Sequence, residues 1–194
     1  SLGIVYPGSH IATAVISAVT GVHIGRSMMF VIGMMVTLYL IFVPLTVRAL
    51  IGDRAAVAIA TFSAAFLLPV TNVSTFVDYH AYSLATFYFP IVLFLLFKYL
   101  ADQPRQSGLG NVFSSTGVAL VVAGIATNLF HPQVAVNMLV LLSTIVVVQW
   151  LYRWLPGDGP LSDARSLLAP TLFIAGFFIL WTLRYEVVYN MLGG

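Results

Sequence analysis

Long apolar stretches alternate with short polar connectors along most of this chain. A helix that crosses the hydrocarbon core of a bilayer needs roughly 20 apolar residues. Pro44 and Pro90 fall inside two of the stretches, which membrane helices tolerate. The pattern predicts an all-α fold in which six transmembrane helices form one bundle over residues 27–183. The expected helices are 27–47, 55–70, 84–99, 112–130, 134–151 and 167–183.

Residues 7–20 form a shorter segment with a different pattern. Pro7 begins the segment and Gly21 follows it, so it is too short to span a bilayer. At helical spacing it has a polar stripe opposite an apolar one, which favours a helix lying in the membrane interface. The alternative is a tilted helix that crosses the membrane. The polar stripe is His10, Thr13, Ser17 and Thr20, and the apolar stripe is Val15, Ile16 and Val19.

Composition supports the membrane interpretation. Hydrophobic residues make up 60% of the chain, charged residues 7%, and the mean hydropathy is +1.02. Soluble domains carry roughly 25% charged residues, so this chain cannot solvate a globular surface. We therefore expect residues 1–194 to be a single transmembrane domain of an integral membrane protein. A net charge of only +2 gives no indication of nucleic-acid binding.

The chain begins with Ser1-Leu2-Gly3 and shows no signal-peptide pattern, so we expect an interior piece of a longer protein. Basic residues flank every second connector, and the positive-inside rule assigns those connectors to the cytoplasm. The opposite side then faces outward, across a plasma or endoplasmic-reticulum-type membrane. The basic residues used are Arg48, Arg54, Lys98, Arg105, Arg153 and Arg165.

Most of the remaining ionisable residues fall on the predicted outer side, where polar groups near a membrane mark a site. Asp78 and His80 are the catalytic candidates, unless they belong only to a solvated loop. The candidates for binding a lipid phosphate are Tyr6, His10, His131, Gln133 and Arg184. For some of these a structural role is the alternative: residues 131–133 can form a simple turn, and Arg184 can extend toward water from a helix end.

A divalent metal ion is the one cofactor that this side could hold. Three of its histidines and Asp78 would supply ligands if their loops converge. No closely spaced pair such as HxxxH is present, so no residue is assigned as a metal ligand from the sequence.

Several motifs occur in an order that resembles one family of membrane enzymes. The order over residues 4–100 is similar to that of the GT-C glycosyltransferases, especially the protein-mannosyltransferase and aminoarabinose-transferase-like group. The second proline of that group's Pro-Pro pair is replaced here. The motifs are Tyr6-Pro7-Gly8-Ser9-His10, a helix closed by Thr20-Gly21, Arg26, the run Val47-Arg48-Ala49-Leu50-Ile51-Gly52-Asp53-Arg54-Ala55-Ala56, and Leu67-Leu68-Pro69.

The resemblance implies transfer of a sugar from a polyprenyl-phosphate carrier to an acceptor on the outer side. It assigns Tyr6, Pro7 and His10 to the wall of the acceptor or carrier site, and Arg26 to a structural role. The acidic motif of the family precedes the Pro-rich stretch, so the family's catalytic carboxylate is expected upstream of Ser1. Two other classes stay open: a transporter or channel domain, and a non-catalytic membrane scaffold. The oligomeric state does not follow from the sequence.

Overall fold

The computed structural model describes residues 7–71, 81–102, 112–152, 154 and 166–184. These residues form an all-α fold with seven helices, as the hydropathy pattern predicts. The helices are α1 (Gly8–Thr20), α2 (Ile24–Leu50), α3 (Arg54–Thr71), α4 (Ala81–Ala101), α5 (Ser115–Phe130), α6 (Pro132–Tyr152) and α7 (Leu168–Leu183).

Three of the helices in the described part of the chain are long and apolar enough to cross a membrane. They are α2 with 27 residues, and α4 and α6 with 21 residues each. At 1.5 Å per residue, α2 extends roughly 40 Å and exceeds a typical hydrocarbon core. Helices α1, α5 and α7 are apolar but shorter, with 13, 16 and 16 residues. The fold therefore indicates an integral membrane protein.

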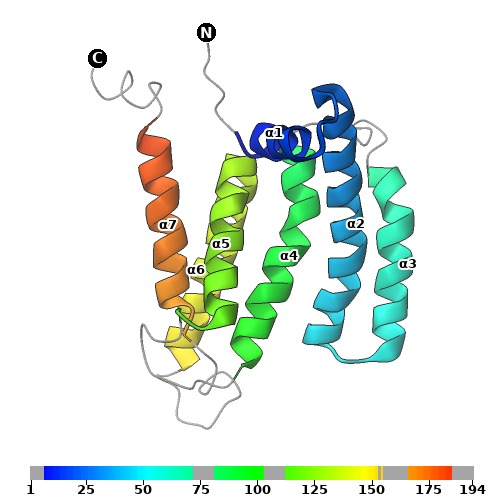
Figure 1. Ribbon diagram of the computed structural model, residues 1–194. Coiled ribbons are helices and arrows are strands. Elements are labelled where there is room, and N and C mark those ends of the chain that lie inside the picture. The colour runs from blue at the N-terminus through cyan, green and yellow to red at the C-terminus, as the bar shows by residue number, and fades with distance from the viewer. Residues whose placement is uncertain (1–6, 72–80, 103–111, 153, 155–165, 185–194) are drawn as a thin grey trace.

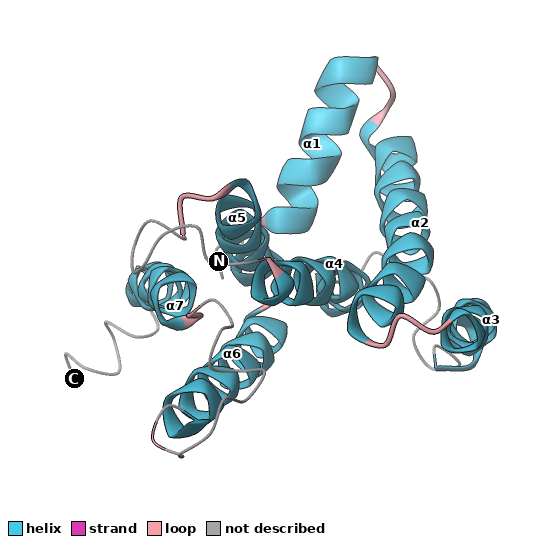
Figure 2. Ribbon diagram, turned by 90° about the horizontal axis from the view of Figure 1, so that it is seen from below, coloured by secondary structure: helices cyan, strands magenta, loops and turns pink. Residues whose placement is uncertain are grey.

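Helices α2 to α7 run alternately up and down one common axis, whereas α1 lies across one end of them (Figure 1). The view along the axis shows α1 spanning the distance between α5 and the start of α2 (Figure 2). We call this end the α1 end. It also contains the first turns of α2, α4 and α6 and the last turns of α3, α5 and α7. The opposite end is the far end.

Helix α4 is central, because it packs against α1, α2, α5 and α6. Two buried clusters share it. One joins α4 to α5, α6 and α7 through residues such as Leu96, Leu120 and Met138. The other joins α4 to α2 near the α1 end, where Val31 and Leu84 are buried and Ala12 and Ile16 of α1 pack against them. Helix α3 packs against α2.

Specific hydrogen bonds hold α4, α5, α6 and the start of α7 together at the far end. The Tyr99 hydroxyl donates to the carbonyl oxygen of Ser166 at 3.1 Å, and Oε1 of Gln149 accepts from the N–H of Leu167 at 3.1 Å. The Thr116 hydroxyl donates to Oδ2 of Asp102 at 2.9 Å. Because Tyr99 and Gln149 are buried, these bonds satisfy polar groups that would otherwise be costly to remove from water.

The prolines inside the long helices coincide with a second cross-link. Pro44 lies within α2 and Pro90 within α4, and both helices continue through them. The hydroxyl of Thr46 donates to the carbonyl oxygen of Pro90 at 3.1 Å and to that of Phe42 at 2.7 Å. A buried side-chain hydroxyl therefore links α2 and α4 at the level of both prolines.

Candidate functional site

The alternation of the helices brings four of the predicted site residues to the α1 end. His10 lies in α1, His131 joins α5 to α6, Gln133 lies in the first turn of α6, and Arg184 follows the last turn of α7. The other three candidates, Tyr6, Asp78 and His80, lie outside the described residues. These residues share one end because successive helices run in opposite directions. Their four side chains do not line a single described cavity.

His131 has a defined structural role. It is the single residue between α5 and α6, with extended backbone angles (φ −161°, ψ 131°). Its Nδ1 accepts a hydrogen bond from the N–H of Gln133 at 3.2 Å. Because this bond needs a lone pair on Nδ1, a neutral His131 carries its proton on Nε2. His23 caps the start of α2 in the same way, through Nδ1 and the N–H of Gly25.

Tyr82 of α4 also contacts His131. The two rings meet edge to face, with centroids 5.2 Å apart and an angle of 85° between their planes. This contact holds the His131 imidazole between α4 and the connection from α5 to α6. The turn interpretation of residues 131–133 therefore describes the geometry, and the same turn presents a polar ring at the α1 end. Sequence spacing could not pair Tyr82 with His131, because 48 intervening residues separate them.

Helix α1 is seated on the last turn of α5 through a glycine. A Cβ atom placed on Gly8 would lie 2.9 Å from the carbonyl oxygen of Leu129 and 3.0 Å from the nitrogen of Phe130. His10 is two positions further along and is exposed. Two residues turn a helix by roughly 200°, so the His10 side chain points away from the side that touches α5.

The inner and outer faces of α1 differ from the predicted stripes. Thr13, predicted on the polar stripe with His10, is buried against the bundle with Ser9. Its hydroxyl donates to the carbonyl oxygen of Ser9 at 2.9 Å, which satisfies it within the helix. Val15 and Val19, predicted on the apolar stripe, are exposed. Close helix packing in membranes favours small residues on the inner face, and the apolar residues remain outside.

Gln133 and Arg184 are both exposed at the α1 end. The Nε2 group of Gln133 donates to Oδ1 of Asn137, one turn later in α6, at 3.2 Å. Arg184 ends α7, where the negative end of the helix dipole favours a cation. Asn137 was not a sequence candidate. Its position four residues after Gln133 is the signal that could have found it, because such pairs share one helix face.

An apolar groove of about 540 Å³ lies between α6 and α7. The α6 wall includes Val136, Val140, Ser143 and Val147, and Phe178 contributes from α7. These α6 positions repeat at intervals of three or four residues and so form one continuous face. Gln133 and Asn137 belong to the same face, so the groove begins directly below their hydrogen-bonded pair.

A buried amide lies between α5 and α7. Asn128 is 1% exposed, and its Nδ2 donates to the carbonyl oxygen of Ile174 at 3.4 Å. Its Oδ1 atom has no partner among the described residues. An amide in an apolar helix is itself a signal of packing or function, since it is costly in lipid. The sequence candidates did not include it.

The possible metal site is not represented in the described residues. Within the ranges from 7 to 184 that the structure covers, no three His, Cys, Asp or Glu side chains come together. Asp78 and His80 lie outside those ranges, so the metal hypothesis remains a prediction.

Comparisons with protein-family models, curated proteins and solved structures found no match to this chain.

Proposed function

We propose that this protein is a membrane glycosyltransferase that transfers a sugar from a polyprenyl-phosphate-linked donor to an acceptor at the α1 end. The observation that carries the proposal is the apolar groove between α6 and α7, which begins below Gln133 and Asn137. A lipid-linked donor has a long apolar tail and an anionic phosphate. The groove suits the tail, and the polar residues at its mouth suit the phosphate.

The dimensions of the groove support a chain-like ligand. Its α6 wall extends from Val136 to Val148, which corresponds to roughly 18 Å along the helix. Burying apolar surface there contributes about 25 cal/mol per Å² when the competing environment is water. A bilayer reduces this gain, because lipid tails are as apolar as the groove. The groove therefore orients the tail, and the headgroup contacts supply most of the selectivity.

The polar groups at the α1 end would act on the leaving phosphate. Arg184 offers guanidinium donors that match phosphate oxygens, and the amide of Gln133 adds a neutral donor. Sugar transfer also needs a base near the acceptor and stabilisation of the departing phosphate charge. Asp78 and His80 remain the candidates for proton transfer in this proposal.

The proposal includes an orientation, with the α1 end outside and the far end in the cytoplasm of a plasma or endoplasmic-reticulum-type membrane. The basic residues Arg48, Arg54 and Lys98 lie at the far end, where the positive-inside rule favours them. In the same topology α1 lies in the outer interface with Ile11, Val15 and Val19 toward the acyl boundary.

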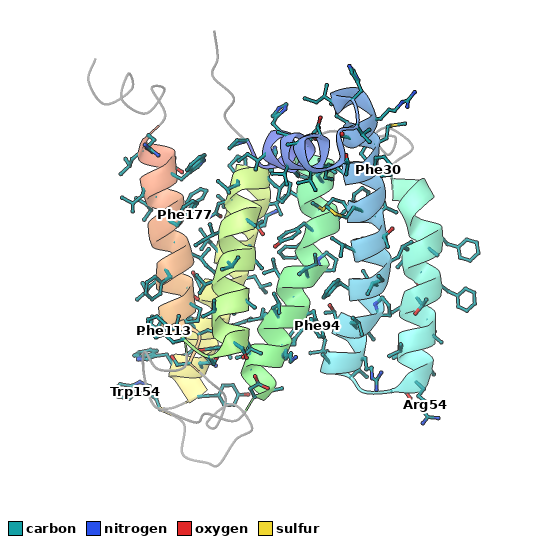
Figure 3. All side chains as sticks on the ribbon, viewed as in Figure 1. Phe30, Arg54, Phe94, Phe113, Trp154 and Phe177 are labelled. Carbon is teal, nitrogen blue, oxygen red and sulfur yellow. The ribbon has the colours of Figure 1, made fainter. Side chains whose placement is uncertain are left out.

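Cysteine labelling tests the orientation directly, because the chain has no cysteine of its own. We expect a membrane-impermeant maleimide to label Gln133→Cys from outside intact cells. Arg54→Cys should be labelled only after the membrane is opened, since it begins α3 at the far end (Figure 3). Labelling of both positions from the same side would exclude the bundle topology, and labelling with the sides reversed would exclude only the orientation.

For the transferase proposal itself, we expect Arg184→Gln to reduce sugar transfer from a polyprenyl-phosphate-linked donor. Loss of a charge-assisted contact to the phosphate should lower kcat/KM by roughly tenfold to a hundredfold. The measurement is transfer of radiolabelled sugar in membranes containing the protein. Arg54→Gln, an exposed arginine at the far end, is the matched control and should leave transfer unchanged.

The groove provides a second arm of the same test. Val140→Phe would fill the groove and should raise the KM for the donor, with a smaller effect on kcat. Val122→Phe is the control, since Val122 is 60% exposed on α5 and Val140 is 61% exposed on α6. The proposal is wrong if no polyprenyl-linked sugar is transferred, or if both valine variants change KM equally.

A further inference from the structure

An exposed stripe descends the first half of α2 from a cation near its start. Arg26 is exposed in the first turn, and Met29 and Phe30 in the next turn are 71% and 60% exposed. Gly33 follows one turn further on the same helix face. Figure 3 places Phe30 near the α1 end of the bundle. A cation above an apolar surface is the arrangement that an amphiphile with an anionic headgroup requires.

A hollow of about 450 Å³ lies on this stripe, lined by Met29, Phe30, Gly33 and Met34. A Cβ atom placed on Gly33 would meet nothing within 4 Å, so the glycine leaves the floor of the hollow open. The two methionines are flexible and can adapt to a hydrocarbon chain. The hollow is therefore suited to an acyl chain rather than to a rigid polar ligand.

The distribution of charge indicates which headgroup would bind. The acidic residues in the described part of the chain are Asp53 and Asp102, and both lie at the far end. Among described residues, no carboxylate is therefore near enough to neutralise Arg26. A guanidinium at the membrane surface favours a phosphate, which it can bind through two parallel hydrogen bonds.

We propose that this stripe is a binding site for one phospholipid with a net negative headgroup. Its phosphate would contact Arg26 and one acyl chain would occupy the hollow over Gly33. These two residues are seven positions apart, or roughly 10 Å along the helix, which matches the descent from a phosphate to the upper part of an acyl chain. The site lies on α2, away from the α6–α7 groove, and does not depend on sugar transfer.

Native mass spectrometry of the detergent-solubilised protein tests this site with phosphatidylglycerol and phosphatidylcholine as probes. We expect wild-type protein to retain one phosphatidylglycerol more tightly than phosphatidylcholine. Arg26→Gln should weaken phosphatidylglycerol binding roughly tenfold, as for one charge-assisted contact, and change phosphatidylcholine binding little. Arg48→Gln, an exposed arginine at the opposite end of the same helix, should bind as wild type does.

A second variant removes the hollow and keeps the charge. Gly33→Leu should weaken binding of both lipids, whereas Gly176→Leu on α7 should not, although an added Cβ there also meets nothing within 4 Å. Wild-type lipid retention in both Arg26→Gln and Gly33→Leu would overturn the proposal. It would also be overturned if Arg48→Gln and Gly176→Leu lose lipid equally, or if the retained mass is a second protein chain. If the wild-type protein retains phosphatidylglycerol as expected but transfers no sugar, only the transferase proposal is contradicted.

Discussion

Gly124→Leu is expected to separate α7 from α5 and to lower the stability of the bundle more than any other substitution considered for it. A Cβ atom at Gly124 would lie 2.5 Å from Cδ1 and 2.9 Å from Cγ1 of Ile174. Alanine already requires Ile174 to move, and leucine requires the helices to move apart. Overpacking of this kind costs about 1 to 3 kcal/mol, and we expect the upper part of that range here.

The cost is increased by a neighbouring hydrogen bond. Asn128 lies one turn after Gly124 and donates to the carbonyl oxygen of the same Ile174. Moving α7 outward would break this bond and leave a buried amide with fewer partners in a medium of low dielectric. A steric change at one residue therefore also removes a polar contact between the same helices.

The measurement is the midpoint of thermal unfolding in a mild detergent, with Gly176→Leu as the matched control. Gly176 lies on α7 in open space, so its leucine variant should unfold close to wild type. Ile174→Ala should partly rescue Gly124→Ala, because it removes the three side-chain atoms that the new methyl group meets. Equal midpoints for Gly124→Leu and Gly176→Leu would contradict the close approach of α5 and α7.

Gly8→Leu is expected to lift the start of α1 from the end of α5. The atoms that a Cβ at Gly8 would meet belong to the backbone of Leu129 and Phe130, at 2.9 to 3.0 Å. Backbone atoms in a helix cannot shift as the end of a side chain can. The helix must therefore tilt or detach, which would displace His10 and expose the inner face of α1.

Accessibility of Thr13→Cys measures this displacement. Thr13 is 2% exposed, so its cysteine variant should react slowly with a water-soluble maleimide. In the Gly8→Leu background the rate should rise about tenfold, equivalent to a local opening easier by about 1.4 kcal/mol. Ala14→Leu adds the same side chain to the exposed face of α1 and should leave the rate unchanged. Equal labelling rates of Thr13→Cys in the Gly8→Leu and Ala14→Leu backgrounds would contradict the close contact between Gly8 and the end of α5.

Much of the candidate site could be placed from the order of apolar and polar segments. His10, His131, Gln133 and Arg184 share an end because successive helices run in opposite directions, so every second connector lies on the same side. This is a matter of counting helices and does not depend on which helices touch. The family resemblance and the orientation in the membrane are not tested by the arrangement of the helices, so both stay predictions.

Contacts between helices could not be predicted in this way. Tyr82 meets His131, Asn128 meets Ile174, and Gly8 meets the backbone of α5, although these partners are far apart in the chain. The face of α1 that packs on the bundle is a further example, since Thr13 of the polar stripe is buried and Val15 of the apolar stripe is exposed. A stripe of polar residues does not identify the solvent side when small hydroxyl residues allow the closest packing.

The amino-acid order alone therefore predicts the helical class, the positions of the helices and the residues that share each end. These features depend on hydropathy, helix length and the need to satisfy backbone groups within a membrane. Only the tertiary structure shows that α4 is central, that a groove lies between α6 and α7, and that a hollow is open over Gly33 of α2. In a membrane both the buried and the lipid-facing sides of a helix are apolar, so hydropathy cannot distinguish them. The packing of particular side chains determines which face of each helix lies inside the bundle.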